Sequence, residues 1–260
     1  ADTDAAATPD AAETITVTDN VGEQTVTQPL ESIVALDSRT FEVLADWGVV
    51  PTAAAVSLMP STNPLKDNAD IVDIGSHREP NLELLVAAEP QLVINGQRFT
   101  QYGEDIAKLV PEATIINLDP REGEDFASEL KRQVTVLGEV FSKEDEAAKL
   151  VADFDAAAER AVAAYDKADK VMAVNTSGGE IGYIAPSLGR ALGPIFDVLG
   201  LTPALEVEGA SDDHQGDDIS VEAIADSNPD WILVMDRDAA VGADDPAYKP
   251  AADILTSSEA

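Results

Sequence analysis

The chain repeats one phrase of sequence, and this repeat constrains the fold more than any other feature. Residues 81–98 read NLELLVAAEPQLVINGQR, and residues 220–237 read SVEAIADSNPDWILVMDR. Each copy predicts a short helix, a turn at a proline, and an apolar strand that ends in an arginine. An internal repeat of this kind predicts two related halves. Glutamate, proline and arginine recur at an offset of 139 residues: Glu83, Pro90 and Arg98, then Glu222, Pro229 and Arg237.

Predicted strands and helices alternate in both halves. In the first half a β-hairpin over residues 13–29 precedes the alternation, and in the second KVMAVNT predicts a strand before the helical segment GRALGPIFDVLGL. This alternation is typical of an α/β fold with a mainly parallel sheet in each half. The strands predicted in the first half cover 32–37, 51–57, 91–95 and 113–119, and further helices are predicted over 39–49 and 245–255.

Helix-forming sequence with one Gly-containing break separates the halves, from Phe126 to Lys170. A connector and a large core helix both fit this pattern, and we favour the connector because the repeat restarts after it. The second copy lacks the strand that follows the helix in the first, so either the C-terminal lobe is asymmetric or the chain is truncated, and we favour a truncated, incomplete lobe. The expected organisation is a flexible tether over 1–13, or simply a frayed terminus, then an N-terminal lobe over 14–138, a connecting helix over 139–168 and a C-terminal lobe over 169–260.

Composition excludes several classes of function. The net charge is -34, from 50 acidic and 16 basic residues, which argues against nucleic acid and anionic membranes as direct partners. There is no cysteine and no apolar run of the roughly 18 residues that a membrane-spanning helix needs. The sequence contains no GxSxG, GxGxxG or HExxH motif and no phosphate loop. These absences argue against an enzyme.

The arginines of the repeat are the strongest candidates for ligand binding. Arg98 and Arg237 each follow an apolar strand directly. Ligands bind beyond the carboxyl ends of strands in open parallel sheets, so we expect both to face one cleft. Arg190, in SLGRALG at the start of a predicted helix, is a third candidate. A guanidinium suits carboxylate, phosphate or catecholate oxygens. The alternative is a surface arginine paired with an acid, and the matched positions of Arg98 and Arg237 favour the anion site.

Two histidines and two glutamates are further candidates. His77 and His214 are too few for a three-histidine metal site, and a lone histidine is usually structural; His214 is the better candidate ligand of the two. Glu83 and Glu222 are the second residues of their predicted helices, where a carboxylate favours the helix dipole. The functional alternative for the glutamates is a matched acidic pair that docks a symmetric basic partner.

Three segments together resemble the iron-siderophore substrate-binding proteins of ABC transporters: DIGSHREPNLELLVAAEPQLVINGQR, LGRALGPIFDVLG and HQGDDISVEAIADSNPDWILVMDRDAAVG. The resemblance runs from about Thr14 to the last residue and is closest to the branch that takes up ferric catecholates. It implies the class III periplasmic-binding-protein fold, with two Rossmann-like lobes joined by one long helix. The family's three arginines for a ferric tris-catecholate trianion fall on Arg98, Arg190 and Arg237. Its iron-binding histidine falls on His214, and its permease-docking glutamates fall on Glu83 and Glu222.

The sequence departs from the family's pattern in two places. The family strand before the first arginine usually ends Ser-Gly-Arg, whereas this one reads Asn-Gly-Gln-Arg with the proline-to-arginine spacing kept. Family members also continue for a few tens of residues and supply a tyrosine as a second iron ligand, which nothing in residues 1–260 matches.

The resemblance implies a binding protein that captures a ferric siderophore and delivers it to an ABC permease. We expect no enzymatic activity, no intrinsic cofactor and no nucleic-acid partner. The protein would be a monomer outside the cytoplasm, either a cell-surface lipoprotein of a Gram-positive-type envelope or a periplasmic protein. Haem, a corrinoid or a hydroxamate siderophore are alternative ligands, and an αβ enzyme or a surface scaffold are alternative classes.

Overall fold

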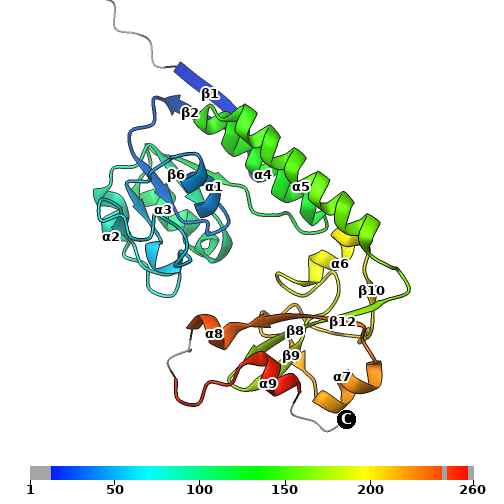
Figure 1. Ribbon diagram of the computed structural model, residues 1–260. Coiled ribbons are helices and arrows are strands. Elements are labelled where there is room, and N and C mark those ends of the chain that lie inside the picture. Colours follow the sequence, from blue (N-terminus) through cyan, green and yellow to red (C-terminus); the bar gives the residue numbers. More distant parts are fainter. Residues whose placement is uncertain (1–12, 242–244, 257–260) are drawn as a thin grey trace, which may run out of the picture. The chain divides into compact units, whose positions relative to one another are not determined.

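The computed structural model describes residues 13–241 and 245–256, and the chain divides into two compact units, Ala1–Ala152 and Asp153–Ala260 (Figure 1). The tether expected over 1–13 lies outside the described residues, apart from Glu13, which begins the first strand. No helix in the described part of the chain has the length and apolar character needed to cross a membrane.

The first unit is built on a five-stranded sheet in which every strand pair is parallel. The strand order β5-β4-β3-β6-β7 runs one way from β3 to β5 and the other way from β6 to β7. The order in which strands are added therefore reverses between β3 and β6, although all the strands are parallel. Ligands bind at such a switch point in open α/β sheets. The strands are β3 (Ile33–Ala35), β4 (Ala53–Ala54), β5 (Val72–Asp73), β6 (Leu92–Asn95) and β7 (Thr114–Asn117), and an antiparallel hairpin of β1 (Glu13–Thr18) and β2 (Glu23–Gln28) precedes them.

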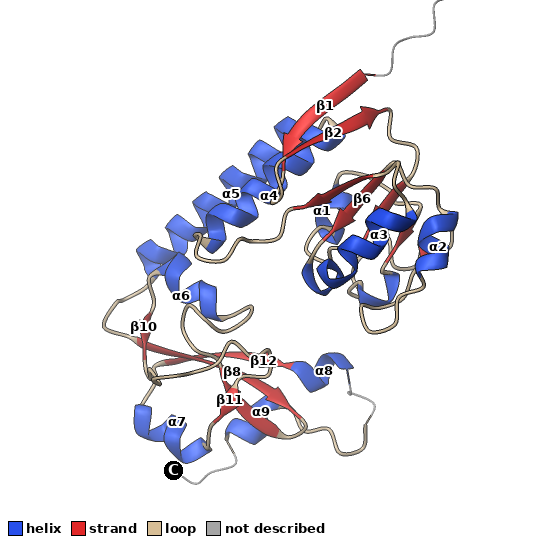
Figure 2. Ribbon diagram, turned by 180° about the vertical axis from the view of Figure 1, so that it is seen from behind, coloured by secondary structure: helices blue, strands red, loops and turns tan. Residues whose placement is uncertain are grey.

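Short helices cover this sheet and close its core. Phe41, Leu85 and Ile106, one from each of three helices, are fully buried in a single cluster with the strand residues. Figure 2 shows these helices around the strands of the first unit. The helices are α1 (Phe41–Asp46), α2 (Leu82–Ala87), α3 (Gly103–Leu109) and α4 (Phe126–Phe141), with 3-10 turns η1 (Val56–Leu58) and η2 (Gln97–Tyr102).

Helices α4 and α5 (Glu144–Ala164) form a hairpin. The chain reverses at Ser142, which adopts a left-handed backbone conformation with φ 54. A Cβ atom added to Gly138 would lie 2.7 Å from the Cβ atom of Ala147, so the glycine permits the close approach of the two helices. The boundary between the two units falls within α5, which is therefore the segment that joins them.

The sheet of the second unit is mixed. Strand β8 (Lys170–Ser177) pairs in parallel with β12 (Trp231–Asp236) and β10 (Thr202–Pro203), and antiparallel with β9 (Glu180–Tyr183). Strand β11 (Asp217–Asp218) continues the sheet antiparallel to β9. The α/β class predicted from the sequence is confirmed, with this antiparallel edge as an addition. The helices are α6 (Gly193–Leu199), α7 (Val221–Ser227), α8 (Arg237–Val241) and α9 (Ala251–Leu255).

The sequence repeat is also a structural repeat. Helix α2 and strand β6 correspond to helix α7 and strand β12, and the residue before each proline adopts the left-handed conformation, Glu89 with φ 47 and Asn228 with φ 49. The two copies differ in what surrounds the strand. β6 is fully buried between β3 and β7, whereas β12 pairs only with β8 among the described strands and leaves Trp231 59% exposed.

Several predicted elements are shorter than expected, and three of them have a local explanation or a replacement. The helix predicted over 189–201 begins only at Gly193, because Ser187 and Ala191 have positive φ and Pro194 favours a helix start at this point. Pro250 immediately precedes α9, which shortens the helix predicted over 245–255. The strand predicted over 51–57 is reduced to β4 and the 3-10 turn after it.

Candidate functional site

Arg98 lies at the switch point of the first sheet, in the turn that follows β6. Gly96 begins this turn, and a Cβ atom there would collide with the carboxylate of Asp37, which follows β3. Gln97 has a left-handed backbone with φ 57, a conformation that a glutamine adopts only when neighbouring groups hold it. The sequence alone predicts the position of Arg98 correctly, and the side chain is exposed.

Asp119 and Arg39 hold the turn in place. Both carboxylate oxygens of Asp119 accept the backbone N–H of Gln97 at 2.8 Å, and Arg39 Nη1 donates to Asp119 Oδ1 at 3.1 Å. The Gln97 side-chain oxygen, in the amide orientation that satisfies both groups, accepts from Arg39 Nη1 at 2.8 Å. These contacts stabilise the left-handed residue and so fix the backbone that precedes Arg98.

The buried carboxylate of Glu129 stabilises the residues around Asp119. Glu129 of α4 accepts hydrogen bonds from the Arg121 side chain at 2.7 and 2.9 Å and from Arg132 Nη2 at 3.0 Å. The hydrogen bonds from Arg121, with a smaller contribution from Arg132, lower the pKa of Glu129 to about 2. Arg132 also donates to the backbone oxygen of Asp119 at 3.2 Å. The ion-pair cluster is therefore connected through Asp119 to the turn that carries Arg98.

The ring of His77 contacts Arg98 directly. His77 Nε2 lies 3.1 Å from Arg98 Nη1, and the ring packs edge-on against the buried Phe99. Partial burial, followed by the charges of Arg98 and Arg78, lowers the pKa of His77 below its ordinary value. No pattern in the sequence connects these two residues, because a contact across 21 positions between two loops leaves no periodic pattern.

In the second unit, Arg237 lies at the carboxyl end of β12, as the sequence predicts. It is the first residue of α8, and its Nη1 donates to Ser177 Oγ at the end of β8, at 3.2 Å. The preceding Asp236 accepts from the backbone of Ala251 at 2.9 Å and from Tyr248 Oη at 3.0 Å. Backbone hydrogen bonds, that from Ala251 first, lower the pKa of Asp236. The strand end that carries Arg237 is thus anchored to α9.

His214 lies in an exposed turn whose backbone is tied to β8 and β9. The amide of Asn175 donates to the His214 backbone oxygen at 3.5 Å, and Gly182 allows the Gln215 carbonyl to approach so closely that a side chain there would overlap it. His214 Nδ1 lies 3.7 Å from Asp213 Oδ1. Asn175 and Ser177 are both in β8, so the carboxyl-terminal half of this strand anchors both the His214 turn and Arg237.

Arg190 is exposed in a turn before α6, three residues short of the helix start. The prediction that Arg190 begins a helix is wrong. Ala191 has a positive φ of 62, which a helix does not allow, so the helix begins later. The backbone oxygen of Arg190 accepts from Leu192 at 2.8 Å and closes the turn. No contact between Arg190 and Arg237 is recorded in the described part of the unit.

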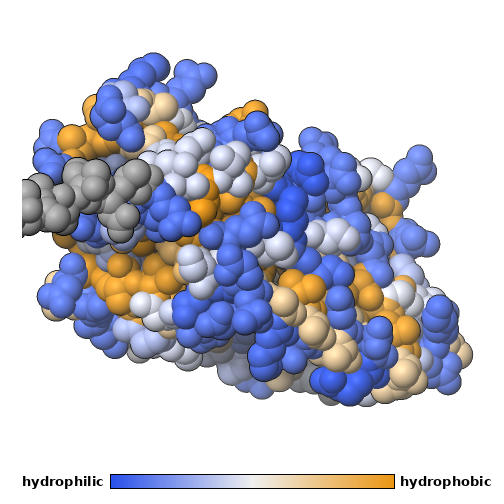
Figure 3. Space-filling view, turned by 90° about the horizontal axis from the view of Figure 1, so that it is seen from above, coloured by the Kyte–Doolittle hydropathy of each residue, from blue (hydrophilic) through white to orange (hydrophobic). Residues whose placement is uncertain are grey.

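The eight arginines of the chain differ in their pairing: three lie beside a carboxylate, and five, Arg78 and Arg160 included, form no ion pair with a described residue. Arg39, Arg121 and Arg132 each lie within 3.1 Å of a carboxylate. Arg98, Arg190 and Arg237 form no ion pair with any residue that the structure describes, although the chain has 50 acidic residues. Figure 3 shows one face of the molecule, on which hydrophilic residues predominate. For these three arginines, the alternative of a surface arginine neutralised by a nearby acid is therefore not observed among the described residues.

Glu83 and Glu222 occupy equivalent positions in the two units. Each is the second residue of its helix and exposed. The N-cap Asn81 accepts from the Glu83 backbone N–H at 3.1 Å, and the N-cap Ser220 accepts from Ala223 at 3.1 Å. Neither carboxylate is in an ion pair with a described residue. Both stay available to a partner while also favouring the helix dipole.

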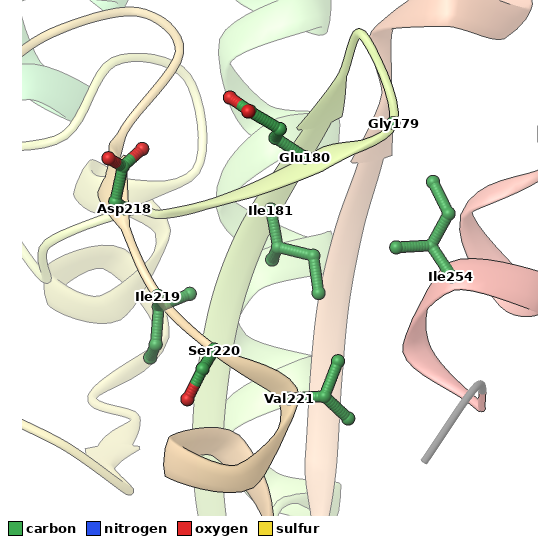
Figure 4. Close-up of a pocket in the computed structure, with 8 residues that line it drawn as sticks. All are labelled: Gly179, Glu180, Ile181, Asp218, Ile219, Ser220, Val221 and Ile254. Carbon is green, nitrogen blue, oxygen red and sulfur yellow. The ribbon is translucent and has the colours of Figure 1, made fainter.

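A pocket of about 460 Å³ opens beside the start of α7 (Figure 4). Apolar side chains line it, among them Ile181, Val221 and Ile254, together with the carboxylates of Glu180 and Asp218. None of the three candidate arginines belongs to its lining. Among the described residues, no three His, Asp or Glu side chains gather so as to hold a metal ion. The pocket is therefore separate from the candidate anion site.

Two acids that contact the Arg98 turn were not predicted from the sequence, although a signal for them exists. Asp37 and Asp119 each follow a Leu at the end of a predicted strand, in VALD and INLD. Burial raises the pKa of Asp37, and the charge of Asp119 adds to the rise. Acids that directly follow two strands of one parallel sheet indicate a polar cluster at its carboxyl edge.

Two α/β units connected through a long helix, with arginines at the carboxyl ends of strands, define a class of substrate-binding protein. Residues 33–258 match the family described as periplasmic binding protein, and the chain belongs to this family. The fold is that of class III periplasmic binding proteins. A siderophore-binding protein, BauB, solved with two acinetobactin molecules and ferric iron, superposes with a TM-score of 0.79 at 24% identity, over 94% of this chain and 84% of that chain.

Curated relatives are similar over most of the chain. The ferric-anguibactin-binding protein FatB of Vibrio anguillarum is 29% identical over 228 residues, which is 86% of this chain and 69% of the relative. The petrobactin-binding protein YclQ of Bacillus subtilis is 25% identical over 216 residues, 82% of this chain and 65% of the relative. The chain thus spans about two thirds of the length of these two relatives.

Proposed function

We propose that this chain is the extracytoplasmic substrate-binding component of an ABC importer and captures a ferric siderophore of the anionic catecholate type. The observation that supports this most is the matched position of Arg98 and Arg237, each just after the carboxyl end of a strand and without an ion pair to a described residue, in a chain of net charge -34. Screening over about 8–10 Å confines the repulsion from distant acids, so a local arginine cluster can attract an anion. Iron arrives with its siderophore as cargo.

The proposed roles of the residues are those that the family resemblance implies. Arg98, Arg190 and Arg237 together neutralise the trianionic ligand, and His214 binds the siderophore-bound iron. Glu83 and Glu222, exposed at equivalent helix starts, dock on basic residues of the permease. Relatives named for binding ferric anguibactin and petrobactin support iron as the cargo. The protein acts by binding and release, as a monomer that is either a surface lipoprotein or periplasmic.

Tryptophan fluorescence provides the test, because the chain has two tryptophans. We expect a ferric tris-catecholate complex to quench the fluorescence at low concentration, and a ferric hydroxamate, haem or a corrinoid to do so only weakly. Equal and negligible quenching by all of them would overturn the proposal.

Arginine variants test the charge argument separately. Arg190→Ala and Arg237→Ala should each weaken binding of the trianion about tenfold or more, because a charged hydrogen bond contributes about 1.5–3 kcal/mol. Arg160→Ala, a change in α5, is the matched control. Equal weakening of a neutral ferric hydroxamate would show that the arginines do not act through charge.

A further inference from the structure

We propose that His77 positions Arg98 for ligand binding and makes this part of the anion site sensitive to protons. The inference rests on the proposed function, and it names a residue to which that function assigns no role. His77 Nε2 lies 3.1 Å from Arg98 Nη1. An arginine has donors only, so the hydrogen bond requires an unprotonated Nε2 and a ring that carries its proton on Nδ1. His77 must therefore be neutral to hold Arg98.

The structure holds His77 in place through the same turn that carries Arg98. Tyr102 Oη donates to the backbone oxygen of His77 at 2.8 Å, and Gln101 Nε2 donates to the same oxygen at 3.3 Å. The ring centroid lies 6.4 Å from that of Phe99, which is 1% exposed. With its backbone and ring fixed by η2, His77 limits the rotamers of the exposed Arg98 side chain. A long arginine side chain loses less entropy on binding a ligand when it is already oriented.

The charges around His77 determine how it responds to pH. Arg98 from η2 and Arg78, the next residue in the chain, are the charged groups whose fields act on the ring, and Tyr102 faces its backbone oxygen. No carboxylate among the described residues forms an ion pair with His77. Burial first, then these two cations, place the pKa of His77 below its ordinary value, so the neutral form dominates near pH 7.

Protonation of His77 has two consequences. It breaks the hydrogen bond, because Nε2 becomes a donor that faces another donor, and it places a second positive charge beside Arg98. A bound anion favours the protonated ring and raises its pKa, so binding takes up a proton as the pH falls. The site therefore gains attraction for anions in mildly acidic solution, whereas near pH 7 the neutral ring serves to orient Arg98.

The first experiment uses the 260-residue chain without ligand. The chain has two histidines, so its imidazole Cε1–H spectrum contains two signals, and His214→Gln identifies the one from His77. We expect the pKa of His77 to lie below 6.5 and to rise in Arg98→Ala, with a smaller rise in Arg78→Ala. An unchanged His77 titration in Arg98→Ala would overturn the contact on which the inference depends.

The second experiment measures binding of a hexadentate ferric tris-catecholate. Near pH 7.5, His77→Gln, whose side-chain oxygen still accepts from Arg98, should bind about tenfold more tightly than His77→Leu, which has no acceptor. Glu79→Gln, an exposed neighbour, is the matched control, and circular dichroism verifies the fold of each variant. Equal affinities of the Gln and Leu variants would overturn the positioning role.

The pH profile tests the proton-sensitive role. We compare the dissociation constant of His77→Gln with that of the unmodified protein. Their ratio should rise as the pH is lowered from about 7.5 to about 5.5, since only the unmodified protein gains a charge at residue 77. Taking the ratio cancels changes in the ligand itself, and a flat ratio would overturn the inference. If Arg98→Ala binds the complex normally, the proposed role of Arg98 fails, while the titration without ligand still reports the histidine–arginine contact.

Discussion

Replacement of Glu129 by glutamine tests the ion-pair cluster behind the Arg98 turn. The side chain of Glu129 is 3% exposed and accepts from both Arg121 and Arg132. A glutamine has nearly the same shape but no charge, so it keeps the packing and weakens each hydrogen bond from an arginine. We expect Glu129→Gln to destabilise the first unit.

The pKa of Glu129 gives the size of this effect. A decrease from 4.5 to about 2 corresponds to about 3 kcal/mol of stability above pH 4.5. Arg121 is 49% exposed, so solvent screens part of the interaction, and we expect a loss of about 2 kcal/mol near neutral pH. Because the folded pKa is lowered, this contribution exists above 4.5 and disappears as the pH falls through about 2. The difference between variant and parent should therefore shrink in acid.

Urea unfolding followed by fluorescence measures the effect in one unit. Trp47 lies in the first unit and Trp231 in the second, so a Trp231→Phe background reports on the first unit alone. Glu124→Gln, an exposed acid in the loop that precedes α4, is the control and should change the free energy of unfolding by less than about 0.5 kcal/mol. A loss for Glu129→Gln as small as the control's, or a loss that is equal near pH 7 and near pH 3, would refute the reasoning.

Two backbone positions give further predictions. Glu89 has a left-handed backbone with φ 47, so Glu89→Asn should raise the free energy of unfolding by about 0.5–1 kcal/mol, and Asn228→Glu at the equivalent position should lower it by a similar amount. Urea midpoints check both, and changes of the same sign would contradict the explanation. Gly182→Ala should lower stability by about 1–3 kcal/mol and move the imidazole signals of His214, because the new methyl group overlaps the Gln215 carbonyl. An unshifted His214 spectrum would show that the turn does not depend on this close approach.

The sequence predicts those elements that have a regular period or a repeated register. The two copies of the repeat, α2–β6 and α7–β12, have a regular period and a repeated register. The sequence therefore predicts correctly that Arg98 and Arg237 follow strand ends. The segment around Arg190 is different. Ala191 and Leu192 are good helix formers, and nothing local signals that Ala191 adopts a positive φ. The turn is set by tertiary contacts, such as the approach of Gly193 to the Ala185 carbonyl, which local propensity does not encode.

The contacts of the candidate site were less predictable than its residues. Asp119 caps the Gln97 N–H from 22 positions away, and His77 meets Arg98 across 21 positions. Such pairs depend on which strands become neighbours, and the order β3-β6-β7 emerges only when the sheet forms. The extra glutamine in the Asn-Gly-Gln-Arg segment was visible in the sequence, whereas its role in fixing the turn through Arg39 was not.

The open edge of β12 has a consequence for how the protein behaves at high concentration. Among the described strands β12 pairs only with β8, and backbone groups left unpaired on its other side, beside exposed Trp231, Ile232 and Val234, are a template for strand addition by another copy. A net charge of -34 opposes such encounters while the ionic strength is low. Near 1 M salt the Debye length falls to about 3 Å, and this protection is lost. Colloidal stability should therefore be greatest in dilute buffer and decline as salt is added.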